Sequence, residues 1–268
     1  MCAIALAVAG CGGSQAADGR LSVVAAFYPL AYAAAQVGGT TVAVRNLTPP
    51  GAEPHDVELS PREVEAVRSA DVVLYLGGGF QPAVEQAVSG ASGTVVDLLP
   101  GLAVGDDPHV WLDPVRYARL ARRVGRALGR PSASLRARAS VLDFEFRAGL
   151  AHCERRELVT SHAAFGYLAR RYGLEQLALT GLSPEAEPSA KRIQELVRRV
   201  RKTGATTVFA ERLVSSKLAD TVAREAGARV AVLDPLESLT NAAATHGEDY
   251  FSVMRANLAA LRQGLGCR

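Results

Sequence analysis

The sequence predicts an α/β protein of two lobes, each with a mostly parallel sheet flanked by helices, joined by a long rigid linker helix. Two observations predict this class. β-type runs alternate with amphipathic helical runs in both halves of the chain, which is the pattern of open parallel sheets. Between the halves, residues 114–154 carry apolar side chains at helical spacing and hold few helix breakers.

The first half contains four β-type runs separated by helical runs. The clearest helix start is Ser60, which we predict as the N-cap because Pro61 follows at the first helical position and Glu63 lies three residues after the cap. The predicted strands are 21–27, 42–47, 71–76 and 94–98, and the predicted helices are 30–37, 61–70 and 82–88.

The second half repeats this scheme after two linker helices, the second of which is predicted from Ser132 to about His152. A helix between the lobes would make a stiff linker rather than a loose hinge. The expected divisions are a first metal-binding lobe at 21–113, linker helices at 114–156 and a second metal-binding lobe at 157–268. The predicted strands are 157–160, 176–180, 206–210 and 229–233, and the predicted helices are 163–172, 189–202, 213–226 and 249–265.

The N-terminal residues indicate where in the cell the protein acts. The apolar run 4–10 is too short to span a bilayer and ends in small residues before Cys11, as in a bacterial lipobox. We therefore expect a signal peptide at 1–10, lipidation of Cys11 and a tether at 11–20, which would anchor the protein to the outer face of a cell membrane or in a periplasm. No basic residue precedes the run, as one would in a signal peptide, which indicates a truncated or misassigned start. Because lipobox matches are short, a buried apolar segment is the alternative.

The remaining cysteines form an even pair. With Cys2 in the signal peptide and Cys11 lipidated, Cys153 and Cys267 would face an oxidising compartment, and we predict a disulfide between them. Two free thiols are the alternative.

The basic residues do not predict nucleic-acid binding. The net charge is +3, and arginines such as Arg116, Arg119 and Arg122 alternate with apolar positions, as on a solvated helix face. No zinc-finger spacing, RNP-type aromatic stretch or basic tail accompanies them.

Three of the five histidines follow predicted strands. His55 lies in a proline-rich loop after strand 42–47, His109 comes after strand 94–98, and His162 follows strand 157–160. Ligands of open α/β sheets bind at the carboxyl ends of the strands, so these side chains are expected in an inter-lobe cleft. Neutral imidazole is a common ligand of transition metals. For any one of these histidines, a surface or helix-capping role is the alternative.

A carboxylate is a candidate for the fourth position. Asp234 follows strand 229–233, and three imidazoles with one carboxylate suit a tetrahedral Zn²⁺ shell. Asp234 could instead be a turn residue before Pro235, with water or Glu211 as the fourth ligand. Glu211, at the end of strand 206–210, could also hydrogen-bond a ligand imidazole. A filled shell favours binding over hydrolysis, and the chain has no His-Glu-x-x-His helix.

Five motifs add a resemblance that covers the whole mature chain. They are PHDVELSP at 54–61, DPHVWLDP at 107–114, SHAAFGY at 161–167, GLSPEAEPS at 181–189 and LDPL at 233–236. With these motifs the chain resembles the zinc and manganese solute-binding lipoproteins of bacterial metal ABC importers. The resemblance implies two lobes around one metal ion, with His55 and His109 from the first lobe and His162 and Asp234 from the second.

The same resemblance favours zinc and a binding function. Manganese members have a carboxylate at the position of His162, and the GLSPEAEPS stretch resembles the zinc branch. We expect a monomer, not an enzyme, that delivers Zn²⁺ to a membrane permease and binds no nucleic acid. The long His-rich loop of many zinc members is missing between His55 and His109. A manganese or iron binder, a metal-binding adhesin and, less strongly, an exported zinc hydrolase are the alternatives.

Overall fold

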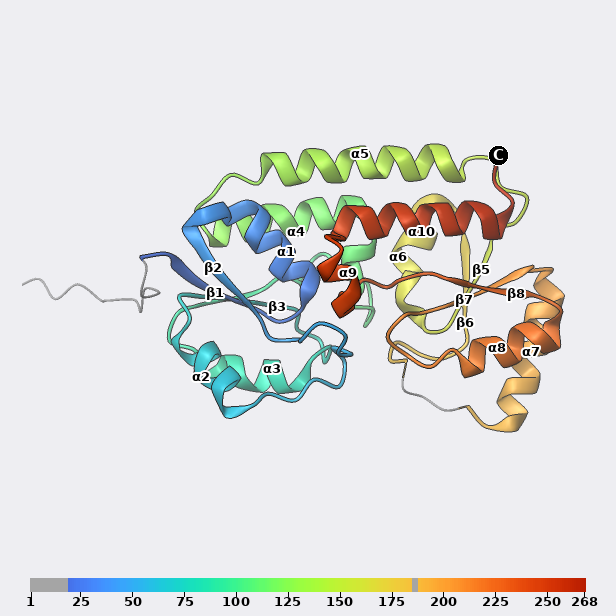
Figure 1. Ribbon diagram of the computed structural model, residues 1–268, viewed down its shortest axis with the longest axis horizontal. Helices are drawn as coiled ribbons and strands as arrows, with labels where there is room; N and C mark the ends of the chain where they lie inside the picture. Colours follow the sequence, from blue (N-terminus) through green and yellow to red (C-terminus); the bar gives the residue numbers. More distant parts are fainter. Residues whose placement is uncertain (1–18, 185–187) are drawn as a thin grey trace, which may run out of the picture.

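Two parallel four-stranded sheets stand side by side in the computed structural model, which describes residues 19–184 and 188–268 (Figure 1). The first sheet has the order β2-β1-β3-β4 and the second has the order β6-β5-β7-β8, so both lobes share one topology. The strands are β1 (Leu21–Ala25), β2 (Val42–Asn46), β3 (Val72–Tyr75), β4 (Thr94–Asp97), β5 (Glu157–Thr160), β6 (Glu175–Ala178), β7 (Thr207–Ala210) and β8 (Arg229–Val232).

The α/β class and all eight predicted strands are confirmed, with ends that shift by a few residues. The signal peptide, Cys11 and most of the predicted tether lie outside the described residues, as do residues 185–187 of the GLSPEAEPS motif. The first-lobe helices are α1 (Tyr28–Gly38), α2 (Pro61–Ser69) and α3 (Pro82–Ala87), with short 3₁₀ turns η1 (Gly39–Thr41) and η2 (Val88–Gly90).

The second-lobe helices are α6 (Gly166–Tyr172), α7 (Ala190–Thr203), α8 (Lys217–Ala226), α9 (Asn241–Thr245) and α10 (Tyr250–Leu265). Two of them start later than predicted. The predicted helix 163–172 begins as the 3₁₀ turn η4 (Ala163–Phe165), and the helix predicted from residue 213 begins at Lys217. In the first lobe, the predicted start of α2 is confirmed, because Ser60 and Glu63 form the reciprocal capping box.

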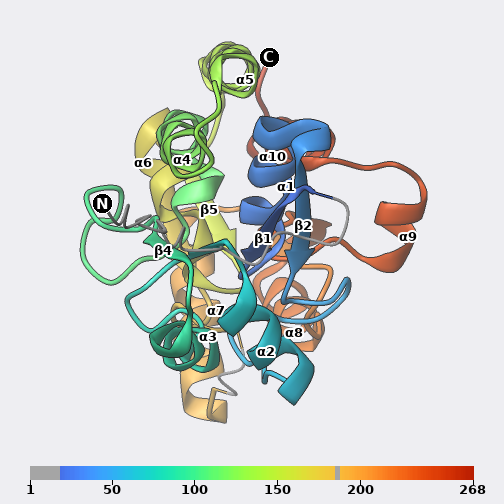
Figure 2. The same ribbon diagram turned by 90° about the vertical axis from the view of Figure 1, so that its left-hand side faces the viewer.

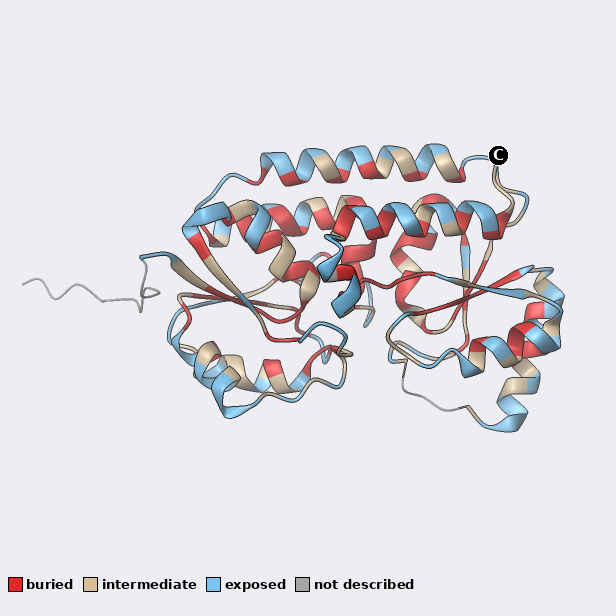
Figure 3. Cartoon of the chain, in the orientation of Figure 1, coloured by how far each residue is buried: buried red, intermediate tan, exposed pale blue. Residues whose placement is uncertain are grey.

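The segment between the lobes folds into the 3₁₀ turn η3 (Val110–Leu112) and two helices, α4 (Pro114–Ala127) and α5 (Ala133–Leu150). In Figure 1, α5 runs along the top of the molecule above both sheets, with α4 and α10 beneath it. Every third or fourth side chain of α5 is buried and faces this layer, namely Leu135, Ala139, Leu142, Phe146 and Leu150. Figure 3 shows the same division on α4 and α10, whose inward faces are buried.

The core is continuous across the lobe boundary. One cluster of buried side chains extends from the first sheet through α4, α5 and α10 to Leu158 and Phe209 on one face of the second sheet. The opposite face of that sheet, with Val159 and Val208, forms a smaller cluster with α7 and α8. Alternate residues of a strand point to opposite faces, so β5 and β7 contribute to both clusters.

The predicted disulfide between Cys153 and Cys267 is present and joins the end of the chain to the segment after α5. Cys153 and Cys267 also form an isolated antiparallel bridge between their backbones. Among the described residues, none of the helices has the length and apolar character needed to cross a bilayer.

Candidate metal centre

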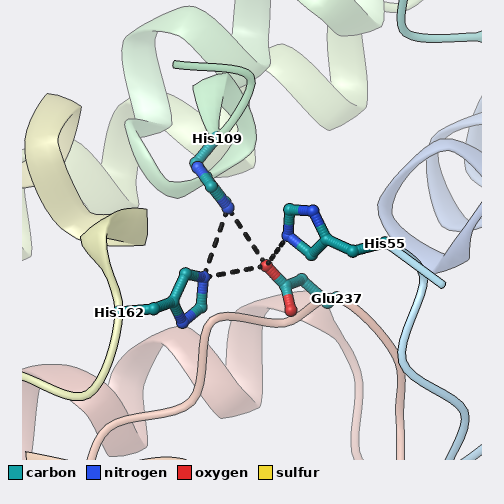
Figure 4. A group of neighbouring side chains, drawn as sticks. All are labelled: His55, His109, His162 and Glu237. Atoms are coloured by element: carbon teal, nitrogen blue, oxygen red, sulfur yellow. Dashed lines mark hydrogen bonds and ion pairs between the residues drawn. The ribbon is translucent and has the colours of Figure 1, made fainter. Parts of the chain in front are cut away.

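Four side chains converge between the lobes: His55, His109, His162 and Glu237 (Figure 4). Each offers one nitrogen or oxygen atom, and these atoms all lie within 4.8 Å of one another. His55 lies in the loop after β2, His109 directly before η3, His162 directly before η4, and Glu237 in the segment after β8. The group therefore takes two members from each half of the chain.

The carboxylate of Glu237 is at the centre of the group. Its Oε1 atom lies 3.4 Å from Nε2 of His55, 3.2 Å from Nε2 of His109 and 3.3 Å from Nε2 of His162. The side chains of His109, His162 and Glu237 are fully buried, and that of His55 is 10% exposed. Nε2 of His109 and Nε2 of His162 are also only 3.4 Å apart.

Two of the imidazoles are held by carboxylates on their far side. Nδ1 of His109 lies 2.9 Å from Asp107 Oδ1, and Nδ1 of His162 lies 2.7 Å from Glu211 Oε1. The latter is the contact with an imidazole that we expected for Glu211. A carboxylate that accepts a hydrogen bond from Nδ1 fixes the tautomer in which Nε2 carries a free lone pair. Both rings thus direct Nε2 toward the centre of the group.

The same two carboxylates also bind the backbone of the histidines they orient. The backbone N–H of His109 donates to Asp107 Oδ1 at 3.0 Å, and the backbone N–H of His162 donates to Glu211 Oε1 at 3.2 Å. Each carboxylate therefore fixes the main chain and the ring of one histidine together.

His55 is positioned in a different way. None of the described side chains accepts a hydrogen bond from its Nδ1, and its ring packs edge-on against Phe80 with centroids 4.7 Å apart. Its loop is tied across the lobe boundary instead: Gly51 N–H donates to Leu239 O at 2.8 Å, and Ser238 Oγ donates to Pro49 O at 3.1 Å. The segment that carries Glu237 therefore also holds the loop that carries His55.

The charges of the group are strongly coupled. Burial alone would lower the pKa of His162, but hydrogen bonds to Glu211 and Glu237 outweigh it and raise that pKa to about 10. Burial is likewise outweighed at His109, whose pKa is raised by hydrogen bonds to Asp107 and Glu237. Burial would raise the pKa of Glu237, yet hydrogen bonds from His109 and His162 hold it well below its usual range. In the metal-free protein, the raised pKa of His162 therefore favours a protonated imidazole beside the Glu237 carboxylate.

A further carboxyl group, Glu53, lies beside this cluster. Burial and the charge of Glu237 raise the pKa of Glu53 to about 9, so it is protonated at neutral pH in the metal-free protein. Its Oε1 accepts from the backbone N–H of His55 at 3.3 Å. Glu53 is part of the surroundings of His55 that sequence reasoning did not identify.

Asp234, our predicted fourth ligand, is not a member of the group, and this corrects the prediction. Its Oδ1 accepts from the backbone N–H of Leu236 at 2.7 Å, and its Oδ2 lies 3.3 Å from Nε of Arg212. Asp234 is thus the turn residue that we had considered as the alternative. Its backbone is fixed by Asn257, whose side chain accepts from Asp234 N at 2.9 Å and donates to Asp234 O at 2.7 Å.

The turn at Asp234 brings in Glu237 three residues later. Leu236 has a φ of 57°, and among the described residues it is the only non-glycine in the left-handed region. On the other side of the turn, the indole N–H of Trp111 donates to Pro235 O at 2.7 Å. No sequence signal distinguished Glu237, because it follows the LDPL motif in an irregular segment.

Three imidazole nitrogens and one carboxylate oxygen at these separations suit a tetrahedral borderline cation such as Zn²⁺. Zinc lies about 2 Å from its ligand atoms, so the four donor atoms would need to move only slightly to surround a bound ion. With four protein ligands no coordination position is kept for a water nucleophile, so the arrangement favours binding over hydrolysis.

Comparisons with known proteins identify the family of the chain. Residues 23–264 match the family model described as the zinc-uptake complex component A, periplasmic. The chain is 36% identical to the zinc-binding lipoprotein AdcA of Streptococcus pneumoniae over 97% of its length, and spans 58% of that relative. It is 30% identical to the high-affinity zinc uptake system protein ZnuA of Bacillus subtilis, covering 97% of this chain and 94% of the relative.

Solved structures show the same fold. The Zn(II)-bound ZnuA-like domain of S. pneumoniae AdcA superposes with a TM-score of 0.80 at 35% identity, covering 92% of this chain and 99% of that domain. The laminin-binding protein Lmb of Streptococcus agalactiae, described as an adhesin with metal-transporting activity, gives a TM-score of 0.82 at 30% identity, covering 91% and 99%. The chain spans a little over half the length of the curated AdcA relatives it matches.

Proposed function

Because the chain belongs to the family of zinc-uptake complex component A, we propose that it captures Zn²⁺ outside the cytoplasm and delivers it to the permease of an ABC importer. The observation that carries this proposal is the buried His₃Glu group between the lobes, since its donor atoms match the preferences of zinc. The protein would act by binding and release, with zinc as the cargo and without catalysis.

The proposed ligands are Nε2 of His55, His109 and His162 and a carboxylate oxygen of Glu237. Zinc would replace the protons that the metal-free group holds, because an imidazole binds metal only in its neutral form. Asp107 and Glu211 would keep two imidazoles in the binding tautomer and increase their basicity. An imidazole at the position of His162, rather than an oxygen donor, favours zinc over manganese.

We also propose that Cys11 carries a lipid that keeps the protein at the membrane where the permease is. The sequence before Cys11 supports this, and relatives of this chain are named lipoproteins. We further propose that 21–113 and 157–268 act as two metal-binding lobes and 114–156 as the linker between them, with the protein working as a monomer.

The test is a metal titration of the purified chain after chelator treatment, followed by calorimetry and elemental analysis. We expect about one Zn²⁺ per chain and weaker binding of Mn²⁺. The matched variants Glu237→Gln and Asp234→Asn test which of the two carboxylates binds zinc. Both positions are buried, they lie three residues apart, and each substitution removes one carboxyl group. Glu237→Gln should weaken zinc binding strongly and Asp234→Asn should leave it nearly unchanged.

The opposite result would replace Glu237 by Asp234 as the ligand. A chain that binds no zinc in this titration would end the proposal as a whole.

A further inference from the structure

The outer face of α5 is apolar where a surface helix is usually polar. Phe144 is 71% exposed and Val141 is 53% exposed, and both lie opposite the buried stripe of this helix. The neighbouring positions on the same outward face, Ala137 and Ala148, are also exposed. These four residues form what we call the crest of α5, the helix that runs along the top of the molecule in Figure 1. Nothing in the fold of the described residues covers the crest.

Charged side chains line both flanks of this crest. On the side of α5 that faces α6, Arg136 is exposed and Arg147 forms an ion pair with Asp143 at 2.9 Å. On the side that faces α10, Arg255 binds Glu145 through two contacts of 2.8 and 3.0 Å. Arg136 has no ion-pair partner among the described residues, so it is a free cation beside the crest.

α4 adds further arginines on the side of α5 where α6 lies. It carries five arginines and no carboxylate, and three of these, Arg119, Arg122 and Arg126, are exposed along one ridge. None of the three has an ion-pair partner within the parts of the chain that the structure describes. Figure 2, viewed along the helices, shows α5 at the top with α4 and α6 below it on one side. The helices that carry the ridge and the crest thus lie next to each other in the upper part of the molecule.

Charge is unevenly distributed along the chain. Residues 114–156 contain eleven arginines against three carboxylates, whereas residues 19–113 contain four arginines against eleven carboxylates. A surface that meets a neutral partner has no need of such a separation of charge. An apolar crest beside unpaired arginines is complementary to a surface whose apolar interior lies beneath a layer of negative charge.

We propose that the crest of α5 and the arginine ridge of α4 form a docking surface for an anionic phospholipid bilayer. Phe144 and Val141 would enter the boundary between headgroups and acyl chains, while the arginines contact phosphates. Docked in this way, the protein would lie with its helical layer on the membrane and both sheets pointing away from it. This adds an orientation to the anchoring proposed for Cys11 and does not depend on zinc binding.

A second copy of the chain is a poorer occupant of the same surface. Two copies packed crest to crest would bring the two arginine ridges and the exposed Arg136 of each copy near one another. Repulsion between like charges opposes that contact, whereas an anionic surface gains from each of them.

The experiment is flotation of the full chain with Cys11→Ser, so that no acyl chain contributes, with two kinds of vesicle. One is pure phosphatidylcholine, and in the other phosphatidylglycerol replaces half of it. We expect binding to the anionic vesicles only, weakened by salt because exposed charges are screened. Substituting Arg119, Arg122 and Arg126 by Gln together should lower the partition coefficient on the order of 100-fold, since each cation near such a surface contributes about fivefold. Phe144→Ser should lower it about tenfold.

Matched controls make the location testable. Gln in place of Arg198, Arg199 and Lys202 removes three exposed cations from α7, which lies on the opposite side of the second sheet from α5. Val104→Ser removes an exposed apolar side chain, 66% exposed, from the acidic first lobe. Neither control should change partitioning, and zinc titration of every variant verifies that it is folded.

Three results would overturn the inference. The first is equal flotation with both vesicles or none with either. The second is a loss of binding in the α7 control as large as in the α4 variant. The third is a concentration-dependent dimer that disappears with Phe144→Ser while vesicle binding is absent, which would assign the crest to self-association.

Discussion

His109 and His162 are built into the site in a way that His55 is not. Both are fully buried, and each has a carboxylate that binds its backbone and its Nδ1 at once. His55 lies on a loop, is partly exposed, and depends on hydrogen bonds that its loop makes with the segment carrying Glu237. Two imidazoles are therefore oriented by carboxylates, whereas the position of the third depends on the position of its loop. We infer that the pair supplies most of the affinity and that the His55 contribution depends on the contact between the lobes.

The largest expected effect is the loss of an oriented ligand. His109→Ala and His162→Ala should each lower zinc affinity on the order of 1,000-fold, because a buried metal site distributes roughly 10–16 kcal/mol over its ligands. His55→Ala should cost less, on the order of tens of fold. Calorimetry in competition with a chelator of known affinity measures all three. If His55→Ala were as damaging as the other two, the proposed difference between the histidines would be wrong.

The second effect is a pH dependence of zinc affinity that extends above the pH range in which histidine usually titrates. The pKa of His162, raised to about 10, means that zinc must displace a proton from this imidazole even at neutral pH, and the pKa of His109 is raised as well. Affinity should therefore rise between pH 6 and pH 9, by about tenfold per unit for each proton released. An affinity that is flat over this interval would show that the metal-free group holds no extra proton.

The same protons change the stability of the metal-free protein in the opposite direction. The pKa of His162 is above its unfolded value of 6.5, so its stabilising contribution is complete below about 6.5 and is lost as pH rises toward about 10. The pKa of Glu237 is lowered, so its contribution is lost only as pH falls below the usual range of a carboxyl group. The Tm of the metal-free chain should fall from pH 6.5 to pH 9, while that of the zinc-loaded chain should not.

A smaller effect is expected from the carboxylates behind the oriented pair. Asp107→Asn and Glu211→Gln keep an oxygen that accepts a hydrogen bond but remove the charge that holds the imidazole, and each should weaken zinc binding about 10–100-fold. Asp234→Asn is the control, since it removes a buried charge near the site without touching a histidine. Equal losses in all three variants would mean that overall charge, rather than orientation, sets the affinity.

The smallest expected effect on the site comes from the disulfide. Replacing Cys153 and Cys267 by Ser should lower the free energy of unfolding by about 2–4 kcal/mol, because the bridge closes a long loop. Zinc affinity should change little, since none of the ligands adjoins either cysteine. Denaturant unfolding and zinc titration of the double variant measure both quantities. A large loss of affinity would show that both kinds of histidine depend on the end of the chain.

Much of the fold could be predicted because its signals are local. The alternation of β-type and helical runs predicted all eight strands, and the pattern at Ser60, Pro61 and Glu63 predicted the start of α2. The three histidines could be found because each follows a strand, and parallel strands end at one edge of their sheet. The exposed crest of α5 was not predicted, because apolar residues on a linker helix suggest burial and only packing shows which face stays open.

The sequence by itself determined the α/β class, the repeated strand pattern, the disulfide and the three imidazoles, since each depends on periodicity, composition or position after a strand. Only the tertiary structure decided which carboxylate joins them. Asp234 and Glu237 follow the same strand, and their roles are set by distant partners: Arg212 and Asn257 fix the first, while the turn at Leu236 directs the second toward His109 and His162. A choice between two carboxylates three residues apart depends on where the chain turns, and that turn is held by contacts remote in sequence.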